Sequence, residues 1–135
     1  MLSTPTSHPD HGLSVVPLRS PTLPPAQHTN MVWVGQERRW IVDPAAHTAQ
    51  EQQRALTILA ENTGDRGWEG VLLTHHHRDH VAAANAISAA LDIPIAAHPI
   101  TAELLAGQIT IDRLLEEGDV VSGGDADNDQ WQVLH

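Results

Sequence analysis

The feature that most constrains this chain is an apolar strand that runs directly into a cluster of imidazole and carboxylate side chains. Residues 70–74 read Gly-Val-Leu-Leu-Thr, and residues 75–80 read His-His-His-Arg-Asp-His. A short apolar run after a glycine is typical of a strand covered on both faces, as in a parallel or mixed sheet. We therefore expect a sheet with further layers around it, and the cluster lies where one of its buried strands ends.

The spacing of these side chains predicts a site for divalent cations. Side chains alternate along extended backbone, so His75 and His77 are expected to point the same way while His76 points elsewhere. His75 and His77 can then chelate one ion. Asp79 stands at the start of a predicted helix with His80 in its first turn, and these two can face a second ion. Imidazole and carboxylate suit zinc, and they suit iron or manganese as well.

Each of these residues also has a simpler interpretation. Asp79 taken alone would be an ordinary helix N-cap, and a run of histidines can be an exposed polar loop. The combination of an apolar strand, the pattern H-x-H-x-D-H and a helix that begins at the aspartate favours a metal site over both.

Composition agrees with a globular protein that binds cations. The 135 residues allow one domain or two, and 41% of them are apolar. Seven basic residues against 17 acidic ones give a formal charge of −10, which argues against broad binding to nucleic-acid phosphates. The absence of cysteine excludes disulfides and thiol nucleophiles. No apolar run is long enough to span a membrane and no secretory signal is recognisable, so we expect a cytoplasmic protein.

The predicted elements alternate between strands and helices. We expect a loose N-terminal tail over residues 1–12 and a partial domain over 13–135. Strands are predicted over 13–18 (at a sheet edge), 29–35, 40–43, 70–74, 94–97, 109–115, 119–122 and 130–135, and helices over 47–62, 79–91 and 99–106. This order is an α/β pattern with βαβ units.

Three further expectations concern packing. Leu56, Leu59 and Ala60 are expected in the buried stripe of the first helix. Trp33 and Trp40 flank the turn of a hairpin and are expected to pack in the core or on the sheet surface. Arg38 and Arg39 are expected in the polar turn that keeps this hairpin soluble.

The whole pattern resembles the metallo-β-lactamase-fold hydrolases, the superfamily that includes glyoxalase II and β-lactamase-like ribonucleases. Their signature H-x-H-x-D-H matches His75, His77, Asp79 and His80. Among the groups of this superfamily, the sequence is most similar to the glyoxalase II and β-lactamase-like protein 2 type.

Further segments extend the resemblance over residues 13–135. Residues 29–44 resemble the family's opening hairpin and its D-P-G or D-T-G turn. Residues 112–119 resemble the strand pair before its third metal motif, and residues 131–135 resemble the lead-in to T-P-G-H.

The resemblance implies roles for individual residues. His75 and His77 would hold a first zinc ion, and Asp79 and His80 would hold a second. A hydroxide between the ions would attack an ester, thioester or phosphodiester, with Asp79 also orienting this nucleophile as the catalytic side chain. Asp43 would lie near the site and orient metal-bound histidines. The other interpretation of Asp43 is an ordinary turn residue before a proline.

The resemblance also implies that this sequence is incomplete. In the family, a third histidine for the first ion, a bridging aspartate and a final histidine for the second ion lie further along the chain than His135. We therefore expect a metallo-β-lactamase-type αβ/βα sandwich with its first half present and its second half missing, which leaves an apolar sheet face exposed. The chain could be a fragment, a natural truncation or a subunit that pairs with its own copy. His47, His98 and His135 are expected to be exposed or structural residues rather than replacement ligands.

Two functions remain open from the sequence. One is metal-dependent hydrolysis of a small ester or thioester substrate, with RNA disfavoured by the acidic balance. The other is a catalytically incompetent metal-binding or interaction module made of the half-fold. With two ligands for each ion, we expect at most about one weakly held ion per chain. No membrane partner is expected, and the exposed sheet face predicts a homodimer.

Overall fold

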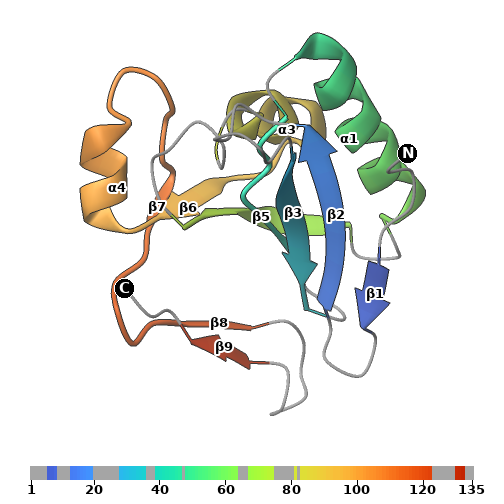
Figure 1. Ribbon diagram of the computed structural model, residues 1–135. Coiled ribbons are helices and arrows are strands. Elements are labelled where there is room, and N and C mark those ends of the chain that lie inside the picture. Colours follow the sequence, from blue (N-terminus) through green and yellow to red (C-terminus); the bar gives the residue numbers. More distant parts are fainter. Residues whose placement is uncertain are drawn as a thin grey trace.

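The computed structural model shows a mixed sheet with helices packed on it (Figure 1). It describes residues 6–8, 13–19, 28–35, 39–46, 48–63, 67–74, 81, 83–122 and 130–132. The described strands are β1 (Thr6–His8), β2 (Leu13–Arg19), β3 (His28–Val34), β4 (Arg39–Val42), β5 (Trp68–Leu73), β6 (Ile95–Ala97), β7 (Arg113–Leu114), β8 (Val120–Ser122) and β9 (Gln130–Gln132). The described helices are α1 (Ala49–Glu61), α3 (Ala84–Leu91) and α4 (Pro99–Leu104).

Strands β1 to β7 form one sheet in sequence order, and its second half is parallel. β1, β2, β3 and β4 pair in antiparallel fashion, whereas β4 pairs with β5, β5 with β6 and β6 with β7 in parallel. Parallel neighbours need crossover connections, and α1 and α3 lie in the first two of them. β8 and β9 form a separate antiparallel pair, which lies below the main sheet in Figure 1 while α1 and α3 lie above it. The α/β architecture with βαβ units is therefore confirmed.

The main core lies between the sheet and helices α1 and α3. Its largest fully buried side chains include Met31, Ile41, Leu59, Val71 and Ile87. β5 is buried at four of its six positions, with Leu72 partly buried and Glu69 exposed, so its apolar run did mark a strand covered on both faces. Ala83, the N-cap of α3, and Ala84 in its first turn are completely buried, and these small side chains let the helix approach the sheet closely.

A smaller apolar cluster lies on the other face of the sheet. It consists of the buried residues Val34, Trp40, Ala96 and Leu115, against which the partly buried Val32, Val42 and Leu72 pack. Gly70 makes room for the Trp40 indole here, because a Cβ at Gly70 would lie 2.5 Å from the Trp40 ring. This face is apolar, as the sequence predicted, and three of its side chains retain partial exposure among the described residues.

Trp68, at the start of β5, connects helix α1 to the hairpin formed by β3 and β4. Its indole N–H donates to the Leu59 carbonyl at 3.2 Å, and its ring meets Trp33 edge to face with 5.3 Å between centroids. The Arg39 guanidinium lies 4.2 Å from the centre of the Trp68 ring and donates to the Thr63 carbonyl. Partial burial lowers the pKa of Arg39, because desolvation disfavours its charged form. Arg39 was expected in an exposed turn, and that expectation is wrong, since the aromatic ring and the carbonyl both offer partners for its planar cation.

The N-terminal region differs from the sequence prediction. Thr6–His8, inside the predicted loose tail over residues 1–12, form β1 and pair antiparallel with β2. β2 therefore has neighbours on both sides and is not the predicted edge strand. The free N–H and C=O groups along an edge strand favour such pairing with any extended segment nearby. Residues 1–5 and 9–12 lie outside the described residues.

The buried face of α1 also differs from the predicted stripe. Thr48 begins the helix as its N-cap, with its hydroxyl accepting from the Glu51 N–H at 3.1 Å. The buried residues are Ala55, Ile58 and Leu59, whereas the predicted members Leu56 and Ala60 are half-buried and exposed. Side chains one position earlier in each turn face the sheet, because packing against β2 and α3 sets the rotation of the helix.

The strand predicted over residues 109–115 and the helix predicted over residues 79–91 also differ in extent from the described elements. The strand expected over residues 109–115 is reduced to Arg113–Leu114. Just before it, the Asp112 carboxylate accepts from the Ile95 N–H at 2.9 Å, and the Asp112 N–H donates to the Ile95 carbonyl at 2.8 Å. Of the helix expected over residues 79–91, the structure describes α3 (Ala84–Leu91) together with Val81 and Ala83 on its N-terminal side.

Truncation of Ile87 tests the position of the main core. Ile87 is fully buried, so Ile87→Ala should lower the free energy of unfolding by about 2–5 kcal/mol and Ile87→Val by about 0.5–1.5 kcal/mol. Ile100 is 54% exposed, and Ile100→Ala should change it by less than about 0.5 kcal/mol. Urea unfolding followed by tryptophan fluorescence measures the free energy of unfolding of all three variants. Equal losses of stability in the two alanine variants would contradict the position of Ile87 in the main core.

Replacement of His98 tests the start of α4. The His98 Nδ1 accepts from the Ile100 N–H at 3.1 Å, which makes His98 the N-cap of a helix that begins with Pro99. His98→Ala should lower the free energy of unfolding by about 1 kcal/mol, because an N–H loses its partner. His98→Asn keeps an acceptor at this position and should stay close to the original protein in the same urea titration. Equal destabilisation by both variants would contradict the cap.

Candidate functional site

The carboxyl ends of the parallel strands gather polar residues at one edge of the sheet. Asp43 follows β4, Thr74 follows β5 and His98 follows β6. Because neighbouring parallel strands end at the same side, these three residues belong to a common edge. In open α/β sheets this is the edge at which ligands bind.

The four predicted ligands continue the chain from this edge. His75, His77, Asp79 and His80 lie outside the described residues, so their coordination stays a prediction. The described residues next to them are Thr74 on one side and Val81 on the other, and Val81 is 4% exposed within the main core. Among the described residues, no group of three histidine, cysteine or acidic side chains is close enough to hold a metal ion.

Asp43 makes a specific connection to the first residue of this edge. Its carboxylate is buried, and it accepts from the Thr74 N–H at 2.9 Å and from the Thr74 hydroxyl at 2.5 Å. The Asp43 N–H donates to the Leu72 carbonyl at 3.1 Å. Asp43 has a φ of +53°, in the left-handed region where aspartate is one of the few tolerated residues besides glycine.

These contacts refine the two interpretations of Asp43 that the sequence left open. Asp43 does sit in a turn before Pro44, and its carboxylate is also engaged beside the predicted metal ligands. The sequence analysis did not identify Thr74 as its partner. The signal for this contact lies in the parallel register, which pairs Val42 with Leu72 and so brings together the residues that follow the two strands.

His98 serves a structural role at the same edge. One of its ring nitrogens accepts the first N–H of α4, as described above, and its side chain is half-buried. This use agrees with the expectation that His98 is structural. His47 and His135, the other two spare imidazoles, lie outside the described residues.

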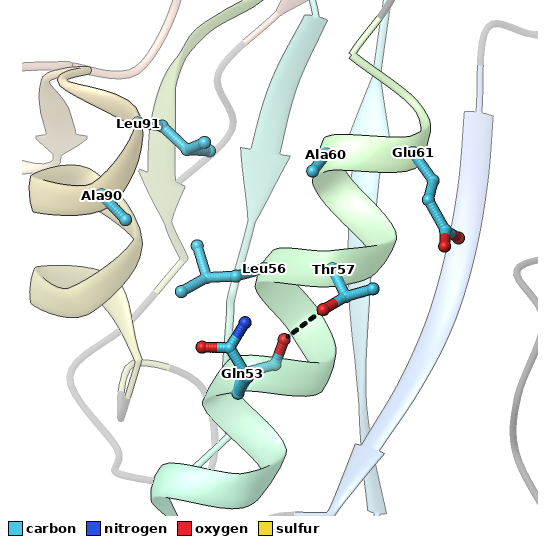
Figure 2. Close-up of a pocket in the computed structure, with 7 residues that line it drawn as sticks. All are labelled: Gln53, Leu56, Thr57, Ala60, Glu61, Ala90 and Leu91. Atoms are coloured by element: carbon cyan, nitrogen blue, oxygen red, sulfur yellow. Dashed lines mark hydrogen bonds between the residues drawn. The ribbon is translucent and has the colours of Figure 1, made fainter.

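An open groove between α1 and α3 is separate from this edge. Figure 2 shows Leu56 of α1 and Leu91 of α3 projecting into the space between the helices, with Thr57 donating to the Gln53 carbonyl at 3.0 Å beside them. Ala60, Glu61 and Ala90 complete its lining. The last turns of both helices contribute to it, and in βαβ units these turns adjoin the amino ends of the strands. Asp43, the one predicted site residue among those that the structure describes, does not line this groove.

Comparisons of the sequence with known proteins identify its relatives. The sequence model of the Metallo-beta-lactamase superfamily matches residues 24–133. The chain is 35% identical over 104 residues to a hydroxyacylglutathione hydrolase of Hahella chejuensis, a match that covers 75% of this chain and 36% of the relative. It is 33% identical over 113 residues to the exodeoxyribonuclease YycJ of Bacillus anthracis, covering 78% of this chain and 41% of that protein.

Solved structures show the same fold. A β-lactamase domain protein from Burkholderia ambifaria superimposes with a TM-score of 0.73 at 18% identity, over 97% of this chain and 47% of that one. A metallo-β-lactamase from Pontibacter korlensis superimposes with a TM-score of 0.68 at 15% identity, over 92% and 57%. The chain thus spans about half the length of these structures and less than half that of the curated relatives, in agreement with the predicted partial fold. This protein belongs to the metallo-β-lactamase superfamily.

Proposed function

We propose that this protein is a metal-dependent hydrolase in which His75, His77, Asp79 and His80 hold zinc. The observation that carries the proposal is the position of these residues, which directly follow the buried parallel strand β5 at its carboxyl end. Three imidazoles and one carboxylate make a donor set that fits zinc. When bound, the metal supplies Lewis acidity, which lowers the pKa of a coordinated water and polarises the group under attack.

The remaining roles fall to residues of the chain itself. Asp79 is proposed to orient the attacking water as well as to bind metal. Asp43 is proposed to support the ligand segment through its bonds to Thr74, the residue that precedes it. His76 lies outside the ligand pattern and is assigned no contact with metal.

A small ester or thioester is the proposed substrate class. One curated relative is named as a hydrolase of hydroxyacylglutathione and the other as an exodeoxyribonuclease, so the family relation alone supports both small-molecule and nucleic-acid substrates. The formal charge of −10 favours the first, because an acidic protein repels a polyanion at long range. No helix in the described part of the chain is long and apolar enough to cross a membrane.

A metal-binding module without turnover is the alternative. Its support is the limited span of this chain, which covers 36% and 41% of its two curated relatives. In that case the ligand segment would bind metal while the groups needed for reaction come from elsewhere. Metal binding and turnover therefore have to be measured on the same preparation.

Metal content in two neighbouring histidine variants tests the ligand assignment. His77→Ala should weaken zinc binding by at least about 10–100-fold, the range seen when only a supporting partner of a ligand is lost. His76→Ala is the matched control and should bind zinc as the original protein does. Elemental analysis after dialysis gives the metal and its stoichiometry, for which we expect at most about one zinc ion per chain. Equal effects of the two substitutions, or no bound metal in the original protein, would contradict the assignment.

Turnover by the zinc-loaded protein tests the reaction class. We expect hydrolysis of an acylglutathione thioester, loss of this activity in His77→Ala, and no release of nucleotides from single-stranded DNA. Stoichiometric zinc without hydrolysis of either substrate would favour the metal-binding module. Cleavage of DNA alone would overturn the proposed substrate class.

Self-association through the sheet face opposite the helices is a further expectation. Val32, Val42 and Leu72 give this face partly exposed apolar surface, and burying it against a second copy would stabilise a homodimer. Light scattering coupled to size-exclusion chromatography should give a mass near twice that of the chain, and Val42→Glu should shift it toward the monomer. A monodisperse monomer of the unsubstituted protein would refute the expectation.

A further inference from the structure

We propose that the groove between α1 and α3 is a docking site for a basic amphipathic helix of a partner protein. Side chains of both helices line this groove, and all of them belong to the described part of the chain (Figure 2). The inference concerns an interaction surface, and it does not depend on the proposed metal site.

The floor of the groove is apolar and open to solvent. Leu56 and Leu91 project into it, and both pack against the main core while they remain partly exposed. Beside them, Ala60 and Ala90 are exposed and too small to fill the space. The groove has a volume of about 470 Å³. Five of its seven lining residues are exposed, so it is too shallow to enclose a small molecule in the way that ligand pockets do.

The spacing of the lining residues on α1 fits a second helix. Gln53, Thr57 and Glu61 follow one another at intervals of four residues and form a polar ridge. Leu56 and Ala60 form an apolar row beside it. Such rows are the ridges between which another helix packs, and this one extends for about 12 Å along the helix axis. A partner helix with apolar side chains three and four positions apart can place them on the apolar row.

The charges around the groove select a cationic partner. Glu61 lines the groove and the exposed Asp92 ends α3, and neither forms an ion pair with another described residue. The last turns of α1 and α3 contain no basic residue, so no cation within those turns offsets the negative ends of the two helix dipoles. The Arg39 guanidinium, which reaches the Thr63 carbonyl beyond α1, is engaged with the Trp68 ring. Lysine or arginine side chains of a partner would therefore be stabilised here, whereas nucleic acid or an anionic membrane would be repelled.

Binding of a designed peptide to the full chain tests the docking site. The probe is a fluorescein-labelled peptide of leucine and lysine with its leucines at helical spacing, about 14 residues long because shorter isolated helices are marginal. Fluorescence anisotropy should show saturable binding. A peptide of the same composition in an order that breaks the helical spacing should bind at least about tenfold more weakly. The same weakening is expected when glutamate replaces lysine in the helical peptide.

Two adjacent alanines of α3 provide a matched pair of variants. Ala90 lines the groove and Ala89 does not, and both are exposed. Ala90→Lys should weaken binding at least about tenfold, because a long cationic side chain fills the groove and repels the lysines of the peptide. Ala89→Lys adds the same charge to the same helix and should leave the affinity unchanged. Lysine in the last turn complements the helix dipole, so both variants should remain folded.

Removal of single carboxylates tests the charge complementarity. Glu61→Gln and Asp92→Asn should each weaken binding of the lysine peptide about 2–5-fold, as expected for the loss of a surface ion pair. Glu103→Gln removes an exposed carboxylate from α4 instead and should leave the affinity unchanged.

The outcomes separate a built docking site from attraction by acidic charge alone. Equal affinities of Ala90→Lys and Ala89→Lys, or equal binding of the helical and the reordered peptide, would overturn the proposal. Absence of saturable binding, or tighter binding of the glutamate peptide, would overturn it as well. Zinc should leave the peptide affinity unchanged, because the groove is separate from the sheet edge that carries Asp43 and Thr74, and competition between zinc and the peptide would contradict this site. A protein that binds the peptide but no zinc would refute the proposed function and support the docking site.

Discussion

The parallel pairing of β4 with β5 and of β5 with β6 is the constraint on which the rest of this structure depends. Parallel strands cannot be joined by tight turns, so the chain has to cross over the sheet between them, and α1 and α3 lie in those crossovers. The helices cover one face and build the main core. The same pairing places the ends of all three strands at one edge, where Asp43, Thr74 and His98 gather.

Those parts of the fold that depend on local sequence could be predicted. The apolar run over residues 70–74 identified a strand buried on both faces, Pro99 marked the start of α4, and alternation of strands with helices indicated βαβ units. Two features that depend on tertiary partners were missed. β1 pairs with the next strand, β2, within the segment predicted as a loose tail. Arg39 is drawn from a predicted turn by the Trp68 ring, which lies far along the chain.

The candidate site likewise has one part that the sequence predicted and one part that it did not. The ligand pattern His75, His77, Asp79 and His80 is continuous in sequence, so it can be recognised without a structure, and it led to the superfamily to which the chain belongs. The bond between Asp43 and Thr74 joins residues 31 positions apart and requires the register of β4 on β5. No local signal carries that register. The proposed metal ligands therefore lie in one short segment of the sequence. The proposed supporting residue, Asp43, lies in a turn that only the folded sheet brings beside Thr74.

The two edge strands of the seven-stranded sheet, β1 and β7, limit how copies of this protein can associate. β1 has three residues beside the seven of β2, and β7 has two beside the three of β6. A strand from another molecule would find few backbone groups to pair with at either margin of the described sheet, and short margins of this kind oppose polymerisation into continuous sheets. The homodimer proposed above would instead use the apolar sheet face of Val32, Val42 and Leu72, where a contact between two copies closes after one partner.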